Sequence, residues 1–121
     1  MVVEAAASGS TMICRVWRGL TTPENAEAYE SVVRGQVIPG IEAMRIPGFR
    51  HIDLMRRDID GEVEFLTIMW FDDIDSIRAF VGEDYEVSHV PPAARAVLAR
   101  FDDRSAHYVV IDRRPQDTAR S

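Results

Sequence analysis

Six side chains of this sequence have the chemistry to bind or change a small molecule, and three of them are histidines. An imidazole titrates near neutral pH, so it can act as a general base that removes the proton of a phenol. His51 and His89 are the candidate catalytic residues. His51 stands in a strand-like stretch with polar neighbours, where the alternative is a histidine paired with a carboxylate. His89 stands in the irregular stretch "YEVSHVPP", where the alternative is a surface histidine, and His107 is expected to be structural or exposed.

The other three side chains, Trp70, Arg15 and Tyr85, are the candidate substrate-binding residues. Trp70 ends the apolar run "EFLTIMWF", where its ring could form a pocket wall and its N–H would need a partner; the alternative is a core residue. Arg15 lies in an apolar stretch on the same face as Trp17, so it needs a carboxylate or a ligand anion. The alternative is an ion pair across a hairpin or a dimer. Tyr85 would orient the substrate.

No pattern of metal or phosphate binding is visible. The histidines lack metal-ligand spacing, and the sequence has no HxxxH motif, no CxxC motif, no Gly-rich phosphate loop and no Ser-His-Asp order. We therefore expect the protein to use neither a metal nor a flavin nor another cofactor.

Composition narrows the function classes further. A chain of 121 residues is expected to form one domain, and its net charge of −6 argues against partners such as nucleic acid or an anionic membrane. No apolar run reaches the roughly 20 residues of a membrane span. Cys14 is the single cysteine, which excludes an internal disulfide and indicates a reducing, cytoplasmic location.

The elements that must position these side chains alternate between strands and helices. The sequence predicts strands at 12–18, 49–57, 63–71 and 105–111, with the turn "DIDGE" joining the middle two as a hairpin. A helix should begin at Thr22 and Pro23 and break or kink at Pro39-Gly40. A second should be capped by Asp72 or Asp73 and end at Gly82, and a short third should follow Pro92. This order predicts an α+β fold, a ferredoxin-like split βαββαβ protomer with an antiparallel sheet, over residues 12–112. Residues 1–11 and 113–121 are expected to be flexible tails.

The predicted strands are apolar on both faces. In 63–71, one face carries Phe65, Met69 and Phe71, and the other carries Ile68 and Trp70. A sheet with one face in water would alternate apolar and polar residues. Because the predicted helices can cover only one face, we expect a homodimer in which a second copy covers the other.

Several stretches resemble the antibiotic biosynthesis monooxygenase family of the dimeric α/β-barrel superfamily. They are "MICRVWRGLTTPENAEAY", "EFLTIMWFDDIDSIRAFVGEDYE" and "PPAARAVLARFDDRSAHYVV", and the resemblance spans about 12–112. It implies a protomer that dimerises through its sheet to form a dimeric barrel, with a pocket between sheet and helices. Members oxygenate aromatic polyketide precursors without metal or flavin, the substrate itself reducing oxygen, while others degrade haem.

In the haem-degrading branch a tryptophan matches Trp70 and a histidine approximately matches His89. That branch also uses an asparagine in the first strand, and "MICRVWR" has none. The sequence therefore predicts a cofactor-independent monooxygenase-like protein for a small aromatic or polyketide-like molecule, with His89 favoured over His51 as the base. The alternatives are a non-catalytic or stress-related ligand-binding dimer and a haem-binding or haem-degrading member.

Overall fold

The sheet has five antiparallel strands in the spatial order β2-β3-β1-β4, with β5 also paired to β1. The computed structural model describes residues 12–117. Its strands are β1 (Ile13–Thr21), β2 (Phe49–Ile59), β3 (Glu62–Phe71), β4 (Arg100–Phe101) and β5 (Ala106–Val109). Its helices are η2 (Pro23–Asn25), α1 (Ala26–Val32), η3 (Val33–Val37), α2 (Ile38–Ala43), α3 (Ile74–Val81) and α4 (Pro92–Arg95). The ferredoxin-like order is confirmed, and the short β4 is an addition to it.

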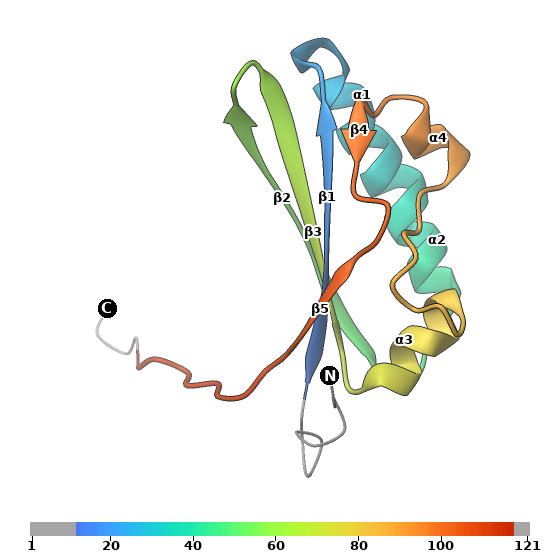
Figure 1. The fold of residues 1–121 in the computed structure, drawn as a ribbon, viewed down its shortest axis with the longest axis vertical. Coiled ribbons are helices and arrows are strands. Elements are labelled where there is room, and N and C mark those ends of the chain that lie inside the picture. Colours follow the sequence, from blue (N-terminus) through green and yellow to red (C-terminus); the bar gives the residue numbers. More distant parts are fainter. Residues whose placement is uncertain (1–11, 118–121) are drawn as a thin grey trace.

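Within residues 12–117, the helices lie on one face of the sheet and none covers the other, which we call the bare face (Figure 1). Within residues 12–117, no helix has the length and apolar character needed to cross a membrane. The predicted tail 1–11 and the last four residues of the predicted tail 113–121 lie outside the described residues.

The β2–β3 hairpin aligns the two strands through a two-residue turn. Asp60 and Gly61 have positive φ angles of 50° and 78°, the backbone that such a turn requires of both residues and that Gly and Asp adopt most readily. The register then places Ile52 opposite Met69 and Leu54 opposite Thr67. A bulge between Phe49 and His51 shifts this register at the other end of the hairpin. The sequence predicted a continuous strand there and did not reveal the bulge.

Of the predicted break or kink at Pro39-Gly40, the break is absent, because the helix continues through both residues. Thr22 Oγ1 accepts from the Asn25 N–H at 3.3 Å, and the chain then runs helically from η2 to the end of α2. The segment η3 is a π-helical turn, and Pro39 follows directly after it. Because the π turn has already interrupted the regular i→i−4 ladder there, the missing N–H of proline is accommodated without a break.

The two aspartates after β3 have separate tasks. Asp73 caps α3 by accepting from the Ser76 N–H at 2.9 Å, whereas Asp72 pairs with Arg50 at the bulge of β2. Gly82 ends α3 with a φ of 97°. The predicted cap and stop of α3 are both confirmed. The Arg50–Asp72 ion pair fixes where the chain leaves the sheet.

The core lies between sheet and helices in two clusters. One is built around Phe71, Ile77 and Phe80, and the other around Tyr29, Val33 and Phe65. The side chains that meet between them, Arg15, Trp17 and Thr67, come from the middle of β1 and β3, and they line the cavity described below.

The opposite face of the sheet is apolar and only partly covered. Val16, Leu66, Ile68 and Trp70 are half-buried there, and Tyr108 is 60% exposed. This is the two-sided pattern that led to the predicted dimer. The structure is that of a single chain, so the homodimer stays a prediction.

Candidate functional site

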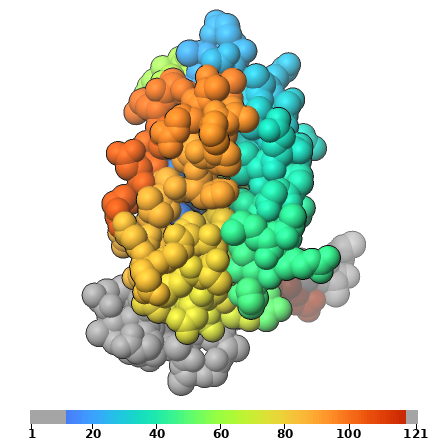
Figure 2. Space-filling model, turned by 90° about the vertical axis from the view of Figure 1, so that its right-hand side faces the viewer, coloured from blue at the N-terminus to red at the C-terminus, as the bar shows by residue number. Residues whose placement is uncertain are grey.

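A cavity of about 50 Å³ lies between the middle of the sheet and the helices. The sheet contributes Arg15, Trp17 and Met69, and the helical side contributes apolar residues spaced by four along one helix: Tyr29, Val33, Val37 and Ile41. The segment after α3 closes the rest, with His89 and Val90 among its lining residues. Figure 2 looks onto this helical face, where blue atoms of β1 are visible through a small gap among the orange and gold atoms.

The size of the cavity limits what it can hold. A buried water needs roughly 10–15 Å³ of such space, whereas ligand pockets for drug-sized molecules are about 300–1,000 Å³. The cavity therefore has room for a few waters or one small chemical group. A fused aromatic ligand requires the side chains that line the cavity to move apart.

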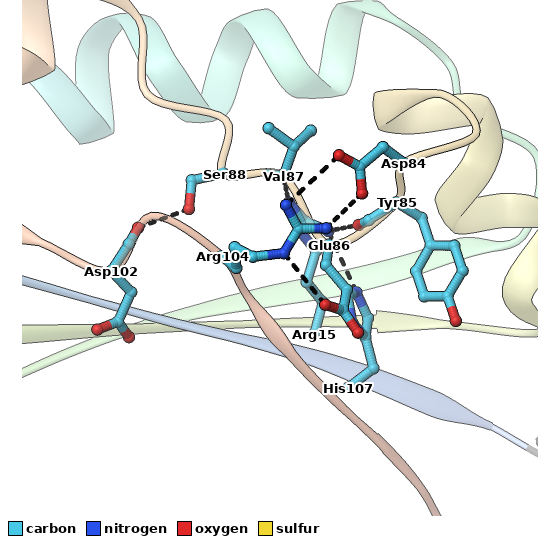
Figure 3. Close-up of polar contacts among 9 residues, drawn as sticks. All are labelled: Arg15, Asp84, Tyr85, Glu86, Val87, Ser88, Asp102, Arg104 and His107. Atoms are coloured by element: carbon cyan, nitrogen blue, oxygen red, sulfur yellow. Dashed lines mark hydrogen bonds and ion pairs between the residues drawn. The ribbon is translucent and has the colours of Figure 1, made fainter. Parts of the chain in front are cut away.

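Arg15 is the most unusual group of the cavity, since it is a cation that is only 3% exposed. Its guanidinium donates to the backbone carbonyls of Tyr85 and Val87 and lies 3.1 Å from His107 Nε2 (Figure 3). No carboxylate within residues 12–117 forms an ion pair with it. Burial lowers the pKa of Arg15 to about 10, which still leaves it charged at neutral pH.

His89 lies at the edge of the same cavity and keeps an exposed side. Its ring centroid is 4.9 Å from that of Phe80, and the Arg15 guanidinium lies 5.4 Å from the same Phe80 ring. Partial burial, and secondarily the charge of Arg15, lower the pKa of His89 below the ordinary 6.5. The imidazole is therefore neutral at neutral pH and free to accept a proton from a ligand in the cavity.

Ser105 and His107 complete the polar part of this region from the last strand. Ser105 is 4% exposed and lines the cavity, and its Oγ has no hydrogen-bond partner in the described residues. His107 faces Arg15 across the β1–β5 pair, and its Nε2 must be the acceptor because guanidinium can only donate. Burial, and then the Arg15 charge, lower the pKa of His107 to about 4, with Glu86 acting in the opposite direction.

The depressed pKa of His107 predicts that the fold loses stability as pH falls from 6.5 to 4. In that window the unfolded chain binds a proton at His107 and the folded chain does not, so the free energy of unfolding should fall by at most about 3 kcal/mol. Urea denaturation at several pH values measures this slope. His107→Gln should flatten it, and His51→Gln, at an exposed position, should not. Equal slopes in both variants would contradict this assignment.

Trp70 and His51 lie together on the bare face of the sheet, away from the cavity. Trp70 Nε1 donates to Asp53 Oδ2 at 3.1 Å, and His51 Nε2 lies 3.8 Å from the same oxygen. The two rings are 5.6 Å apart. The expected placement of Trp70 as a wall of the pocket was wrong, because its position in β3 points it to the face opposite Thr67 and Met69.

Tyr85 contributes to the region by its backbone rather than by its side chain. Its carbonyl accepts from Arg15, while its ring lies 5.3 Å from that of His107 and 5.6 Å from the Arg78 guanidinium. The side chain does not line the cavity. Of the five predicted site residues, the structure brings Arg15 and His89 to the cavity and Tyr85 to its outer edge, and it places His51 and Trp70 elsewhere.

Three cavity residues were not among the candidates. Trp17 shares a face with Arg15, a signal already present in the alternation of β1, and its Nε1 donates to the Asp102 carbonyl at 2.9 Å. Tyr29 follows the apolar spacing of the first helix, which predicts only packing in the core. Ser105 carries no sequence signal, because serine is common at the beginning of a strand.

Comparison with known proteins shows relationship in the fold alone. No protein-family model matches the sequence, and no curated protein matches it. Among solved structures, a protein from Bacillus cereus provisionally named as an antibiotic biosynthesis monooxygenase superposes with a TM-score of 0.53 at 13% identity, covering 89% of this chain and 100% of that one. One from Nitrosomonas europaea with the same provisional name gives 0.54 at 11% identity, over 85% and 90%. One from Chloroflexus aurantiacus J-10-fl, also so named, gives 0.51 at 15% identity, over 88% and 97%. This chain therefore has the fold of the antibiotic biosynthesis monooxygenase structures.

Proposed function

We propose that this protein is a monooxygenase-like enzyme that oxidises a small aromatic molecule with an acidic hydrogen, and that the substrate itself supplies the electrons to oxygen. The observation that carries the proposal is His89, an imidazole kept neutral at the edge of an apolar cavity beside a buried cation. The independence from metal and flavin is taken from the family resemblance, and the fold is consistent with that resemblance.

The chemistry assigns one step to the protein and leaves the rest to the substrate. His89 accepts a proton from the ring CH₂ of a hydroxyanthrone-type substrate, leaving an electron-rich anion held near Arg15. The anion adds to O₂ to form a hydroperoxide at that carbon. Loss of water from the hydroperoxide turns the CH₂ into C=O, so one oxygen atom enters the product and the other leaves as water. Once the cavity has widened to admit the ligand, its apolar walls from Tyr29 to Ile41 would pack against the aromatic rings.

The test is oxygen consumption by the purified protein with 1,8-dihydroxyanthrone in the presence of a metal chelator. The proposal expects a rate above the spontaneous oxidation and one ¹⁸O atom from ¹⁸O₂ in the new carbonyl. A rate equal to that of buffer alone would reject it for this substrate class. Trp17→Phe should weaken binding of the substrate more than Trp70→Phe does, since only Trp17 lines the cavity.

A non-catalytic ligand-binding dimer is the second candidate function, and one observation favours it. The cavity of about 50 Å³ is mostly filled by side chains, as in a protein that binds only a small group. Saturable binding of an aromatic ligand without oxygen consumption would support this function over the first. Haem is disfavoured, because Trp70, the residue matched to the haem-degrading branch, lies on the face of the sheet opposite the cavity; a Soret shift on titration would contradict that conclusion.

We also propose that two copies associate through the bare face of the sheet. Its apolar residues, among them Ile68 and the 60% exposed Tyr108, form a continuous surface of the kind that marks an interaction site. Light scattering should report twice 13.7 kDa. Ile68→Glu places a charge in this face and should give the monomer, whereas Ala28→Glu, an exposed position on α1, should leave the dimer intact. A wild-type monomer at micromolar concentration would end this proposal.

A further inference from the structure

We propose that Arg15 and Ser105 form a subsite for one anionic oxygen group, so that the molecule bound in the cavity carries a carboxylate or an ionised hydroxyl. The inference deepens the proposed function and rests on it for the identity of the cavity as the binding site. It adds a requirement on the ligand: a neutral aromatic hydrocarbon would not satisfy the two polar side chains.

Within residues 12–117, no carboxylate pairs with Arg15 to balance its charge. Burying a cation is costly unless an anion accompanies it, and surface arginines of this chain such as Arg57 and Arg104 do contact carboxylates. Arg15 is more buried than either, yet its partners are two backbone carbonyls and a neutral imidazole. These partners fix the position of the guanidinium without supplying negative charge. A ligand anion in the cavity would supply it.

Ser105 provides the second, independent observation. Its side chain is almost fully buried, lines the cavity, and has an Oγ that neither donates nor accepts a hydrogen bond in the described part of the chain. A buried hydroxyl without a partner carries a desolvation cost that a ligand oxygen would remove. Since Ser105 lies two residues before His107, and His107 pairs with Arg15 across β1–β5, the strand directs both side chains to the helix-covered face.

The dimensions of the cavity agree with a head-group site. About 50 Å³ admits a carboxylate or a phenolic oxygen but not an aromatic ring system. The anionic group would therefore sit against the sheet at Arg15 and Ser105, with the body of the ligand toward His89 and the gap in the helical face (Figure 2). The anion would then lie where it offsets the charge that lowers the pKa of His89.

The experiment compares anionic ligands with neutral ligands of the same shape, by calorimetry on the full chain at constant ionic strength and pH 8. The pairs are acetate with acetamide, benzoate with benzamide, and 4-nitrophenolate with 4-nitroaniline. We expect at least one anion to bind about tenfold or more tightly than its neutral partner, and the preference for benzoate or for nitrophenolate tells a carboxylate from an ionised hydroxyl. Anions that bind no better than their neutral partners would overturn the proposal.

Two variants and a matched control locate the subsite. Ser105→Ala should weaken anion binding about tenfold or more, the usual effect of losing a hydrogen bond to a charged group, and Arg15→Met should abolish the preference for anions. Arg18→Met is the control, because Arg18 lies in the same strand but on the other face. Loss of binding in Arg18→Met, or full binding in the Ser105 variant, would contradict the assignment.

A spectroscopic readout keeps the test independent of activity and of the Arg15 variant. Saturation with the anion should raise the pKa of His89, followed by NMR of its ring, because the anion offsets the nearby guanidinium. If Arg15→Met does not fold, Ser105→Ala and this shift decide the question, and an unchanged His89 pKa under saturating anion would overturn the subsite. Anion binding without oxygen consumption would reject the proposed oxygenase function and support the subsite. Oxygen consumption with no preference for anions would support the oxygenase function and reject the subsite.

Discussion

Replacing His89 by Gln is expected to lower the rate of substrate-dependent oxygen consumption by about 10²–10⁴, the usual contribution of a general base. Glutamine preserves much of the size of the imidazole but cannot accept the substrate proton. Because the base is a single side chain at the edge of the cavity, the loss should fall on the rate at saturating substrate more than on substrate binding. Steady-state oxygen uptake over a range of substrate concentrations separates the two.

The pH dependence of the rate of oxygen consumption tests the same role of His89. The base works when neutral, so the rate should be constant at neutral pH and fall only below 6.5, since the pKa of His89 is lowered from that value. His51→Gln is the matched control, because His51 lies on the bare face and its change should leave the rate within a few-fold of the wild type. Equal losses in the two variants, or a rate unaffected by His89→Gln, would remove His89 from the mechanism.

The largest effect on stability is expected for Phe71→Ala, with a loss of about 3–5 kcal/mol in the free energy of unfolding. Phe71 is 0% exposed, and its ring lies 5.4 Å from that of Phe49 and 6.3 Å from that of Phe80. Removing it leaves a cavity where the sheet, α3 and the end of β2 meet. Urea denaturation monitored by circular dichroism measures the loss.

The neighbouring Trp70→Ala is the control for this prediction. Trp70 is the adjacent residue of the same strand, but its ring lies on the bare face beside His51 and under the Arg113 guanidinium. Both substitutions should be made in the Ile68→Glu background, so that dimerisation does not contribute to the comparison. The loss for Trp70→Ala should be clearly the smaller of the two. A larger loss at Trp70 than at Phe71 would mean that the two faces of β3 have been assigned the wrong way round.

The sequence was sufficient to predict the fold, but not which face of the sheet the helices cover. Alternation correctly separated Phe71 from Trp70 and placed Trp17 beside Arg15. It could not decide which of the two sets lies under the helices, because both faces of the sheet are apolar. The family resemblance then favoured Trp70 for the pocket, although the face carrying Arg15 and Trp17 is the one that the helices cover.

The partners of Arg15 show a second limit of prediction from sequence. A buried arginine was expected to need a carboxylate or a ligand anion, and its contacts in the structure are backbone carbonyls and His107, which the sequence did not predict. Backbone acceptors are present at every residue, so no residue type marks them in advance. His89 was a candidate because of its loop position, and what brings it to the cavity is the packing of its ring on Phe80, which depends on tertiary structure.

The π-helical turn at η3 also determines where the helix that runs from α1 to α2 can lose one residue. Four residues of α-helix advance by about 400°, so side chains spaced by four drift about 40° at each step around the helix. Tyr29, Val33, Val37 and Ile41 nevertheless all reach the cavity, because a π turn accommodates one residue more than an α-helical turn. Gly35 is exposed, and a Cβ added there would meet no atom within 4 Å, so loss of its codon would convert the turn to ordinary α-helix and leave both flanks in place. The same loss anywhere else in this helix would rotate one flank by about 100°. In relatives of this protein, a one-residue gap should therefore fall at this turn, and gene variants that shorten the helix elsewhere should be selected against.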